Sequence, residues 1–393
     1  MAFESVDIYS WSVIIFVLIL AAIIYIDRKN LEIKYLLIMR KTKKGIKILD
    51  ELAKYPKFWK IVGTLGIFVA IFLMSIGLIS LIEFSRKIIL GEIVGPVGGI
   101  VLPSPTKTTI LGPGFIGLPF WIWIIILPVI MLPHEIFHGI MARVEKVKIK
   151  SFGVFLLAIF PGAFVEPNEN QVKKLRIIKK LRIFVAGSFA NFLVSLLLFT
   201  PFLNTGLIPN FIWPFFVSDG LYITSLNETA PAYKAGIPAN STLTHINGEK
   251  IKVTYNDYLS GTYLLKYLEK IKAGEEIVLT VNEKNYSVIP IEISHNNITR
   301  PYVGVTLKPV VKMDEKFFFE FLIPLLTWMW ILSFAVATIN ILPIYPLDGG
   351  HVFKSIIEKI SKKHQNLIVS LVSVLVVGLL IFSIVGPYII KIF

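Results

Sequence analysis

Long uncharged apolar runs recur along the chain, and short segments that hold most of the charged residues separate them. A helix of about 20 mostly apolar residues can span a bilayer. Six runs are of that order: 8–26, 61–82, 108–133, 183–218, 321–347 and 365–390. The fourth is longer than one span, so we place its helix near 183–203. The pattern predicts a polytopic α-helical membrane protein with about six transmembrane helices.

A seventh apolar stretch, SFGVFLLAIFPGAFV at 151–165, is too short to cross a membrane. Pro161 and Gly162 interrupt it near its end. We therefore interpret it as a re-entrant or interfacial hairpin rather than a seventh span.

The segment between the fourth and fifth spans has a different pattern. LYITSL alternates apolar and polar residues as a half-buried strand does, and Asn247-Gly248 marks a tight turn between two strands. EEIVLTV and YSVIPIEI predict a second hairpin across 282–285. This segment is expected to form a small α+β domain inserted into the membrane protein.

Composition agrees with a membrane protein, because 55% of the residues are hydrophobic. The chain has no cysteine, which excludes disulfides and thiolate metal sites. Its net charge of +14 does not indicate nucleic-acid binding, since Lys and Arg cluster in loops between the apolar runs. Segments 27–60 and 143–182 carry eleven and ten of them, whereas 84–117 carries three. By the positive-inside rule the first two are cytoplasmic and the insert lies outside.

Two histidines and a glutamate stand at the end of the third apolar run, in HEIFH. Positions i and i+4 share one face of a helix, so His134 and His138 can both direct ring nitrogens at one zinc ion. Glu135 is then placed to act as general base toward a metal-activated water. The alternative is a hydrogen-bonded histidine pair packed between helices. Ionisable side chains inside an apolar span are costly, which favours the functional interpretation.

A catalytic zinc ion takes a third protein ligand. Glu145 and Glu166 follow the motif, but neither continues the same helix face cleanly. The better candidate is Asp348 in NILPIYPLDGGH, because the predicted topology puts it at a similar depth to HEIFH. His351 is the second choice for this ligand. The prolines and glycines of this segment forbid a regular helix, and irregular backbone at membrane depth lines a cavity or is buried in protein.

Together these motifs resemble the site-2 protease family of intramembrane zinc metalloproteases. The resemblance rests on HEIFH, on the N-x-x-P-x-x-x-L-D-G frame that begins at Asn340, on AGSFANFL at 186–193 and on FPGAFVEPNE at 160–169. It implies one Zn²⁺ held by His134, His138 and Asp348, with Glu135 as base and proton shuttle. It also implies residues that bind the substrate backbone or the oxyanion: Asn340, Asn191 and the hairpin residues Gly162, Ala163, Phe164 and Val165. For Asn191, helix packing beside Gly187 is an equal alternative.

The order of elements in the insert, from SDGLYITSL through ETAPAYKAGIPANSTLTHINGEKI to AGEEIVLTV, resembles a PDZ domain. Such domains bind a peptide by adding it as a strand to a sheet edge. The resemblance implies a groove lined by Gly220, Leu221, Tyr222 and Ile223. The alternative is a spacer domain without a ligand.

These predictions divide the chain into six parts. They are a first transmembrane helix and basic cytoplasmic loop (1–60), a second helix and Gly/Pro-rich outer loop (61–116), core helices with HEIFH and the hairpin (117–203), an extracytoplasmic PDZ-like domain (204–316), a helix with the LDG motif and a cytoplasmic loop (317–366), and a last helix (367–393).

The expected function is cleavage of single-span membrane proteins by a multi-pass enzyme of the cell membrane, with its active site near the cytoplasmic face. The PDZ-like domain would dock a peptide or the substrate ectodomain, and no nucleic acid is involved. A metal transporter is the first alternative, but it needs polar residues along several spans, whereas here they gather at one depth. A non-proteolytic zinc-binding chaperone is the second, and it is expected to have lost Glu135 or a ligand.

Overall fold

The computed structural model describes residues 8–390 except 94, 96, 199–206, 262–266, 268–270 and 296–297. The chain forms two compact units. The first joins Met1–Ser195 to Thr327–Phe393, and the second, Leu196–Leu326, is inserted between these two segments.

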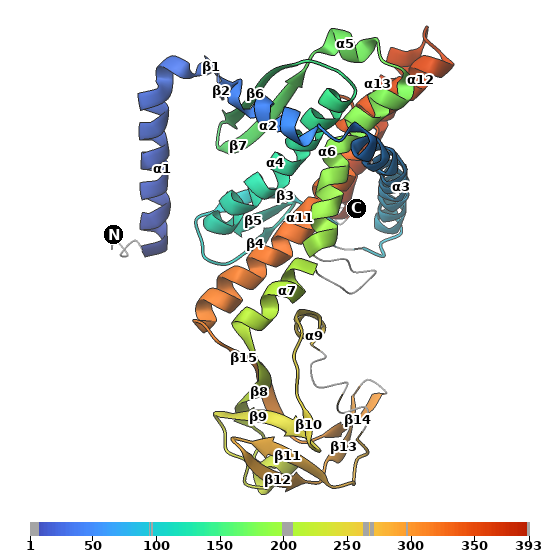
Figure 1. Cartoon of the computed structure of the whole chain (residues 1–393). Helices are drawn as coiled ribbons and strands as arrows, with labels where there is room; N and C mark the ends of the chain where they lie inside the picture. The colour runs from blue at the N-terminus through green and yellow to red at the C-terminus, as the bar shows by residue number, and fades with distance from the viewer. Residues whose placement is uncertain are drawn as a thin grey trace, which may run out of the picture. The chain divides into compact units, whose positions relative to one another are not determined.

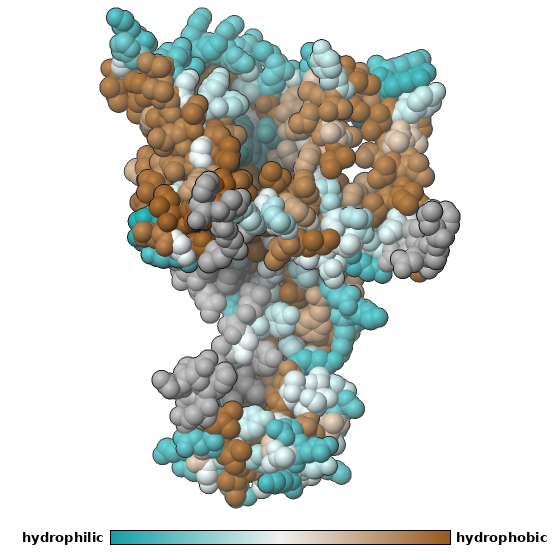
Figure 2. Space-filling view, turned by 180° about the vertical axis from the view of Figure 1, so that it is seen from behind, coloured by the Kyte–Doolittle hydropathy of each residue, from teal (hydrophilic) through white to brown (hydrophobic). Residues whose placement is uncertain are grey.

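Within the described residues, six helices are long and apolar enough to cross a membrane, as the apolar runs predict. They are α1 (Ile8–Asp27), α3 (Pro56–Ile89), α4 (Phe120–Val144), α6 (Ile177–Leu198), α11 (Ile323–Ile341) and α13 (Gln365–Ile390). Figure 2 shows apolar side chains covering much of the surface of the helical unit, with hydrophilic residues gathered at its upper rim. The protein is therefore a multi-pass membrane protein.

The third helix begins later than its apolar run. Residues 108–119 are uncharged, but they hold three glycines and two prolines and form strands instead of a helical turn. Strands β3 (Ile100–Ser104), β4 (Ile110–Gly112) and β5 (Phe115–Pro119) make a small sheet in the order β3-β5-β4. Helix α4 starts directly after it, at Phe120.

The short apolar stretch is a β-hairpin, and the basic loop before the second span extends it into a sheet. Strands β6 (Ile149–Leu157) and β7 (Phe160–Pro167) pair with each other, and β6 also pairs with β2 (Leu37–Thr42). With β1 (Glu32–Lys34) the order is β1-β2-β6-β7, so β7 is an edge strand. Figure 1 shows this sheet beside α4. The role of the basic loop in the sheet was not predicted.

The core of the helical unit lies among α3, α6, α11 and the shorter helix α12 (Asp348–Ile360). Its buried side chains are Ile67, Ala70, Leu73, Val185, Ala337, Ile341 and Val352. Two further short helices, α2 (Lys44–Leu52) and α5 (Glu169–Lys173), and a 3₁₀ turn at Arg28–Asn30 complete the unit. This packing holds α6, α11 and α12 together, and a second cluster, which includes Met141 of α4 and Ile183 of α6, joins α4 to α6.

The inserted unit has its own hydrophobic core and a sheet in the order β12-β11-β9-β8-β15. Its strands are β8 (Val217–Leu226), β9 (Ser241–Ile246), β10 (Glu249–Lys250), β11 (Ile277–Val281), β12 (Lys284–Val288) and β15 (Val305–Val311), with a separate hairpin of β13 (Ile291–His295) and β14 (Ile298–Tyr302). Its helices are α7 (Leu207–Phe216), α8 (Pro231–Lys234), α9 (Tyr255–Ser260) and a π-helix at Phe317–Leu322.

The position expected for a peptide groove lies inside this sheet. Residues Leu221, Tyr222 and Ile223 pair with β9 on one side and with β15 on the other. A peptide cannot add to β8 there as a further strand, because both of its edges are occupied. The terminal strands of the sheet are β12 and β15.

Candidate metal centre

The two histidines of HEIFH lie one turn apart on α4 and face the same point. Their Nε2 atoms are 3.2 Å apart, as the i, i+4 spacing predicts. Their side chains are only 12% and 13% exposed. Pro133 stands directly before His134 within the helix and has no N–H group, so the backbone at this turn lacks one helical hydrogen bond.

Asp348 reaches the histidines from the first turn of α12. Its Oδ2 lies 3.3 Å from Nε2 of His134 and 3.3 Å from Nε2 of His138. Helix α11 ends at Ile341, and the proline-containing turn that follows leads back into α12. Gly349 permits this return, because a Cβ at that position would lie under 3.0 Å from the carbonyl of Ile341. The sequence-based prediction that the segment 340–351 breaks the helix is confirmed for residues 342–347, but Gly349 and Gly350, which were also expected to break it, lie in the first turn of α12.

The three ligand atoms have the spacing that a zinc ion requires. Ligands about 2.0–2.1 Å from a tetrahedral zinc ion lie roughly 3.3 Å from one another. The observed separations are 3.2, 3.3 and 3.3 Å. Gly187 of α6 leaves room beside them, because a Cβ there would crowd the Nε2 atoms of both histidines. These three residues therefore fit a zinc ion and form a group that could hold one.

Glu135 is held by the edge strand of the hairpin. The backbone N–H of Val165 in β7 donates a hydrogen bond of 2.8 Å to its Oε2. Val165 lies opposite Phe152 of β6 in the antiparallel ladder, and its N–H points away from β6 toward α4. The carboxylate thus lies against the edge of β7.

Helix α6 supplies further contacts to all three candidate ligands. His138 Nδ1 donates to the carbonyl oxygen of Ile183 at 2.7 Å, and Ser188 Oγ donates to Asp348 Oδ2 at 3.3 Å. The amide nitrogen of Asn191 lies 3.1 Å from Nδ1 of His134. Sequence reasoning missed Ile183 and Ser188, although Ser188 lies within the AGSFANFL motif.

The rejected ligand candidates have other partners. Glu145 is buried and pairs with Arg182 at 2.9 Å and with Lys179 at 3.5 Å. Glu166 accepts hydrogen bonds from Lys150 and Ser151, which hold the pKa of its carboxyl below the usual value.

His351, the second choice for the third ligand, stacks on Phe184 with ring centroids 5.0 Å apart. Burial lowers the pKa of its imidazole. Asp348 is the residue that meets the two histidines.

The other predicted site residues lie on α11 and on the hairpin. Asn340 is the last residue but one of α11, two residues before the break. Gly162, Ala163 and Phe164 lie on β7, next to Val165. Gly162 faces α4, because a Cβ there would meet the side-chain end of Met131 at 2.8 Å.

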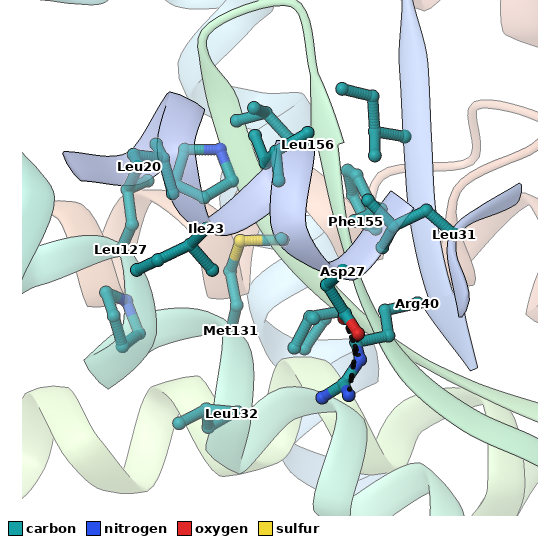
Figure 3. Close-up of a pocket in the computed structure, with 17 residues that line it drawn as sticks. Leu20, Ile23, Asp27, Leu31, Arg40, Leu127, Met131, Leu132, Phe155 and Leu156 are labelled. Carbon is teal, nitrogen blue, oxygen red and sulfur yellow. Dashed lines mark hydrogen bonds and ion pairs between the residues drawn. The ribbon is translucent and has the colours of Figure 1, made fainter. Parts of the chain in front are cut away.

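An apolar cavity of about 360 Å³ adjoins the hairpin. Its walls come from α1, α4 and the sheet, and they include Ile23, Met131, Phe155 and Ala163. Figure 3 shows Asp27 at one side of the cavity, joined to Arg40 of β2. Ala163 of the cavity wall thus lies two residues before Val165, whose N–H binds Glu135.

Comparison with known proteins agrees with this geometry. The model of a family described as Peptidase family M50 matches residues 122–384, which hold the histidines, the aspartate and the insert. The chain is also 26% identical over 362 residues to the uncharacterized protein MJ0971 of Methanocaldococcus jannaschii. That match covers 91% of this chain and 88% of the relative.

Proposed function

This chain belongs to peptidase family M50, the site-2 protease family of zinc metalloproteases, and from that membership we propose that it hydrolyses peptide bonds within the transmembrane segments of membrane-anchored proteins. The observation that carries the proposal is the meeting of His134, His138 and Asp348 at mutual distances of 3.2–3.3 Å, with Glu135 beside them. His134 and His138 lie in α4, one of the six helices long and apolar enough to cross a membrane, and this supports cleavage within the membrane.

In this proposal His134, His138 and Asp348 hold one Zn²⁺, which would supply Lewis-acid polarisation of the scissile carbonyl. Glu135 accepts a proton from the attacking water and gives it to the leaving amine nitrogen. The N–H of Val165 orients the carboxylate for this transfer by binding one of its oxygens. The second oxygen is then left to face the water and the substrate.

Substrate binding is proposed at the edge of β7. Residues two apart in a strand direct their backbone groups to the same side, so Ala163 and Val165 both face away from β6. An unwound substrate segment can pair there as an added strand, next to Glu135. Asn340, at the end of α11, is proposed to hydrogen-bond the substrate backbone or the developing oxyanion.

The apolar cavity supports entry of the substrate from the side. It lies between α1 and the hairpin, and its wall includes β7 residues next to the proposed binding edge. None of the side chains of α1 is buried, so this helix packs loosely on the rest of the unit. An apolar segment that fills the cavity stays out of water until its backbone reaches Glu135.

The insert is proposed to be a PDZ-like domain outside the cytoplasm, where it docks or filters substrate ectodomains. If it binds a peptide by strand addition, β12 and β15 offer the terminal strands. The charge distribution around the spans supports an active site near the cytoplasmic face of the cell membrane.

Replacement of Asp348 tests the proposed site. The Asp348→Ala variant, purified in detergent, is expected to lose most of its bound zinc and its cleavage of a single-span substrate, because only two protein ligands remain. Metal analysis and the appearance of cleavage products measure both effects. His351→Ala is the matched control in the same helix, and it should keep its zinc. Full zinc content in Asp348→Ala would contradict the proposed ligand set.

A further inference from the structure

One side of α6 contacts the distal ring nitrogen, Nδ1, of both histidines, but the two contacts differ. His138 Nδ1 faces the carbonyl oxygen of Ile183, which can only accept a hydrogen bond. The proton of a neutral His138 is therefore fixed on Nδ1, and Nε2 keeps a lone pair for a metal. His134 Nδ1 faces the side-chain amide of Asn191, which can either donate or accept.

Asn191 is fully buried, with 0% of its surface exposed. A substrate cannot reach this side chain without displacing the helix packing around it. Among the residues that the structure describes, Oδ1 of Asn191 is buried and has no hydrogen-bond partner, while the amide nitrogen lies 3.1 Å from His134. A buried polar atom without a partner is unfavourable. This orientation of the amide thus leaves its oxygen unpaired.

The observed contact matches the tautomer of His134 that cannot bind metal. An amide nitrogen donates, so it requires a lone pair on Nδ1, and the proton of a neutral His134 then lies on Nε2. From there it is directed at Asp348 Oδ2, 3.3 Å away. A metal ion at Nε2 requires the opposite tautomer, with the proton on Nδ1 and an acceptor facing it.

We propose that Asn191 is a positioning residue for His134, with the oxygen of its side-chain amide turned toward Nδ1. A half-turn of the amide exchanges oxygen and nitrogen without changing the shape of the group. Oδ1 then accepts the Nδ1–H of His134, gains the partner that it lacks, and fixes the tautomer in which Nε2 is free to ligate. This inference rests on the proposed zinc site, and it replaces direct contact with the substrate as the role of Asn191.

Zinc affinity tests this inference. Full-length protein in detergent is titrated against a competing zinc chelator as the unaltered chain, as Asn191→Leu and as Asn191→Asp. The Leu side chain offers no acceptor, so the affinity should fall by about 10–100-fold, the usual effect of losing such an outer contact. The Asp side chain offers only acceptors when it is ionised, so the affinity should stay within about threefold of the unaltered value or increase. Cleavage by Asn191→Leu should return at saturating zinc.

Ser195→Ala is the matched control, because Ser195 lies one turn further along α6, is also buried, and among the described residues donates to the carbonyl oxygen of Phe192 in its own helix. It should leave zinc affinity unchanged. Unchanged affinity in Asn191→Leu would overturn the inference, and so would a loss in Asn191→Asp of tenfold or more. If Asn191→Leu does not fold, the zinc affinity of Asn191→Asp decides alone, and a loss of tenfold or more overturns the inference. Failure of the unaltered chain to bind zinc or to cleave would instead contradict the proposed function.

Discussion

At the scale of single residues, the site depends as much on a missing side chain as on those present. Gly187 lies against both histidines, and no other residue type leaves the space beside their Nε2 atoms open. The residues above and below it on α6, Ile183 and Asn191, face the opposite nitrogen of each ring. The helix thus borders the candidate metal position and also determines which ring nitrogens can face it.

Gly187→Ala is predicted to abolish zinc binding, because the added methyl group would lie within 2.5 Å of the Nε2 atoms of both histidines and displace their rings. Metal analysis of the purified variant measures the effect. Gly378→Ala serves as control, since a Cβ at that position of α13 meets nothing within 4 Å. Normal zinc content in Gly187→Ala would show that the ion lies elsewhere.

Sequence alone could predict the histidine pair and Asp348, because the first follows from helical spacing and the second from its depth in the predicted topology. The orientation of Asn191 could not be predicted. It depends on the rotation of α6 about its own axis, and the sequence does not show toward which neighbouring helix the small and polar residues of AGSFANFL face. The pairing of Glu135 with Val165 was equally hidden, since it depends on the register of a hairpin.

At the scale of elements, α4 and α6 are joined at one end by a buried ion pair. Glu145 directly follows α4, and its side chain is 1% exposed, while Arg182 stands one residue before Ile183. Arg182 also donates to Thr64 of α3 at 3.1 Å. This contact fixes α6 at the turn whose carbonyl binds His138.

Glu145→Gln is predicted to lower the free energy of unfolding by about 3 kcal/mol, because it leaves the partly buried Arg182 without its charged partner. Unfolding in mixed micelles, followed by tryptophan fluorescence, measures the change. The control is Glu51→Gln, which removes an exposed ion pair with Lys54 and should change the free energy by less than about 1 kcal/mol. Equal effects of the two substitutions would contradict a structural role for the Glu145–Arg182 pair.

The spans were predictable as elements, because their apolar length exceeds anything that a soluble domain requires. Their ends were less predictable. Residues 108–119 contain glycines and prolines and form strands instead of the start of α4. Helix α6 begins at Ile177, before the apolar run, because Lys179, Lys180 and Arg182 pair with carboxylates within the helix's first two turns. The strand β2 was missed, since its basic residues look like a loop until β6 pairs with it.

At the scale of the whole molecule, the chain inserts one unit into another without interrupting the core of the first. The insert has a hydrophobic core of its own. The three candidate ligands, His134, His138 and Asp348, all belong to the helical unit. The sequence predicted a separate domain from its alternating pattern. The resemblance to a PDZ domain predicted a groove on β8. In the structure β8 is an interior strand of the sheet, because β15 pairs with its other edge.

Replacement of residues 217–311 by a short flexible linker is predicted to leave the zinc content unchanged, because no candidate ligand is removed. Cleavage of a short single-span substrate should persist, whereas discrimination against substrates with a large folded ectodomain should be lost. Metal analysis and a comparison of the two substrates measure this. Loss of zinc would show that the insert is needed to build the metal site.

The most direct test of the central claim is cleavage of a single-span substrate by the Glu135→Gln variant, with its zinc content measured in the same sample. The amide keeps the shape of the carboxylate but cannot accept the proton of the attacking water, so cleavage should fall by about 100-fold or more. Zinc should remain at one ion per chain, and Glu166→Gln on the neighbouring strand should retain its activity. Undiminished cleavage by zinc-loaded Glu135→Gln would contradict the account.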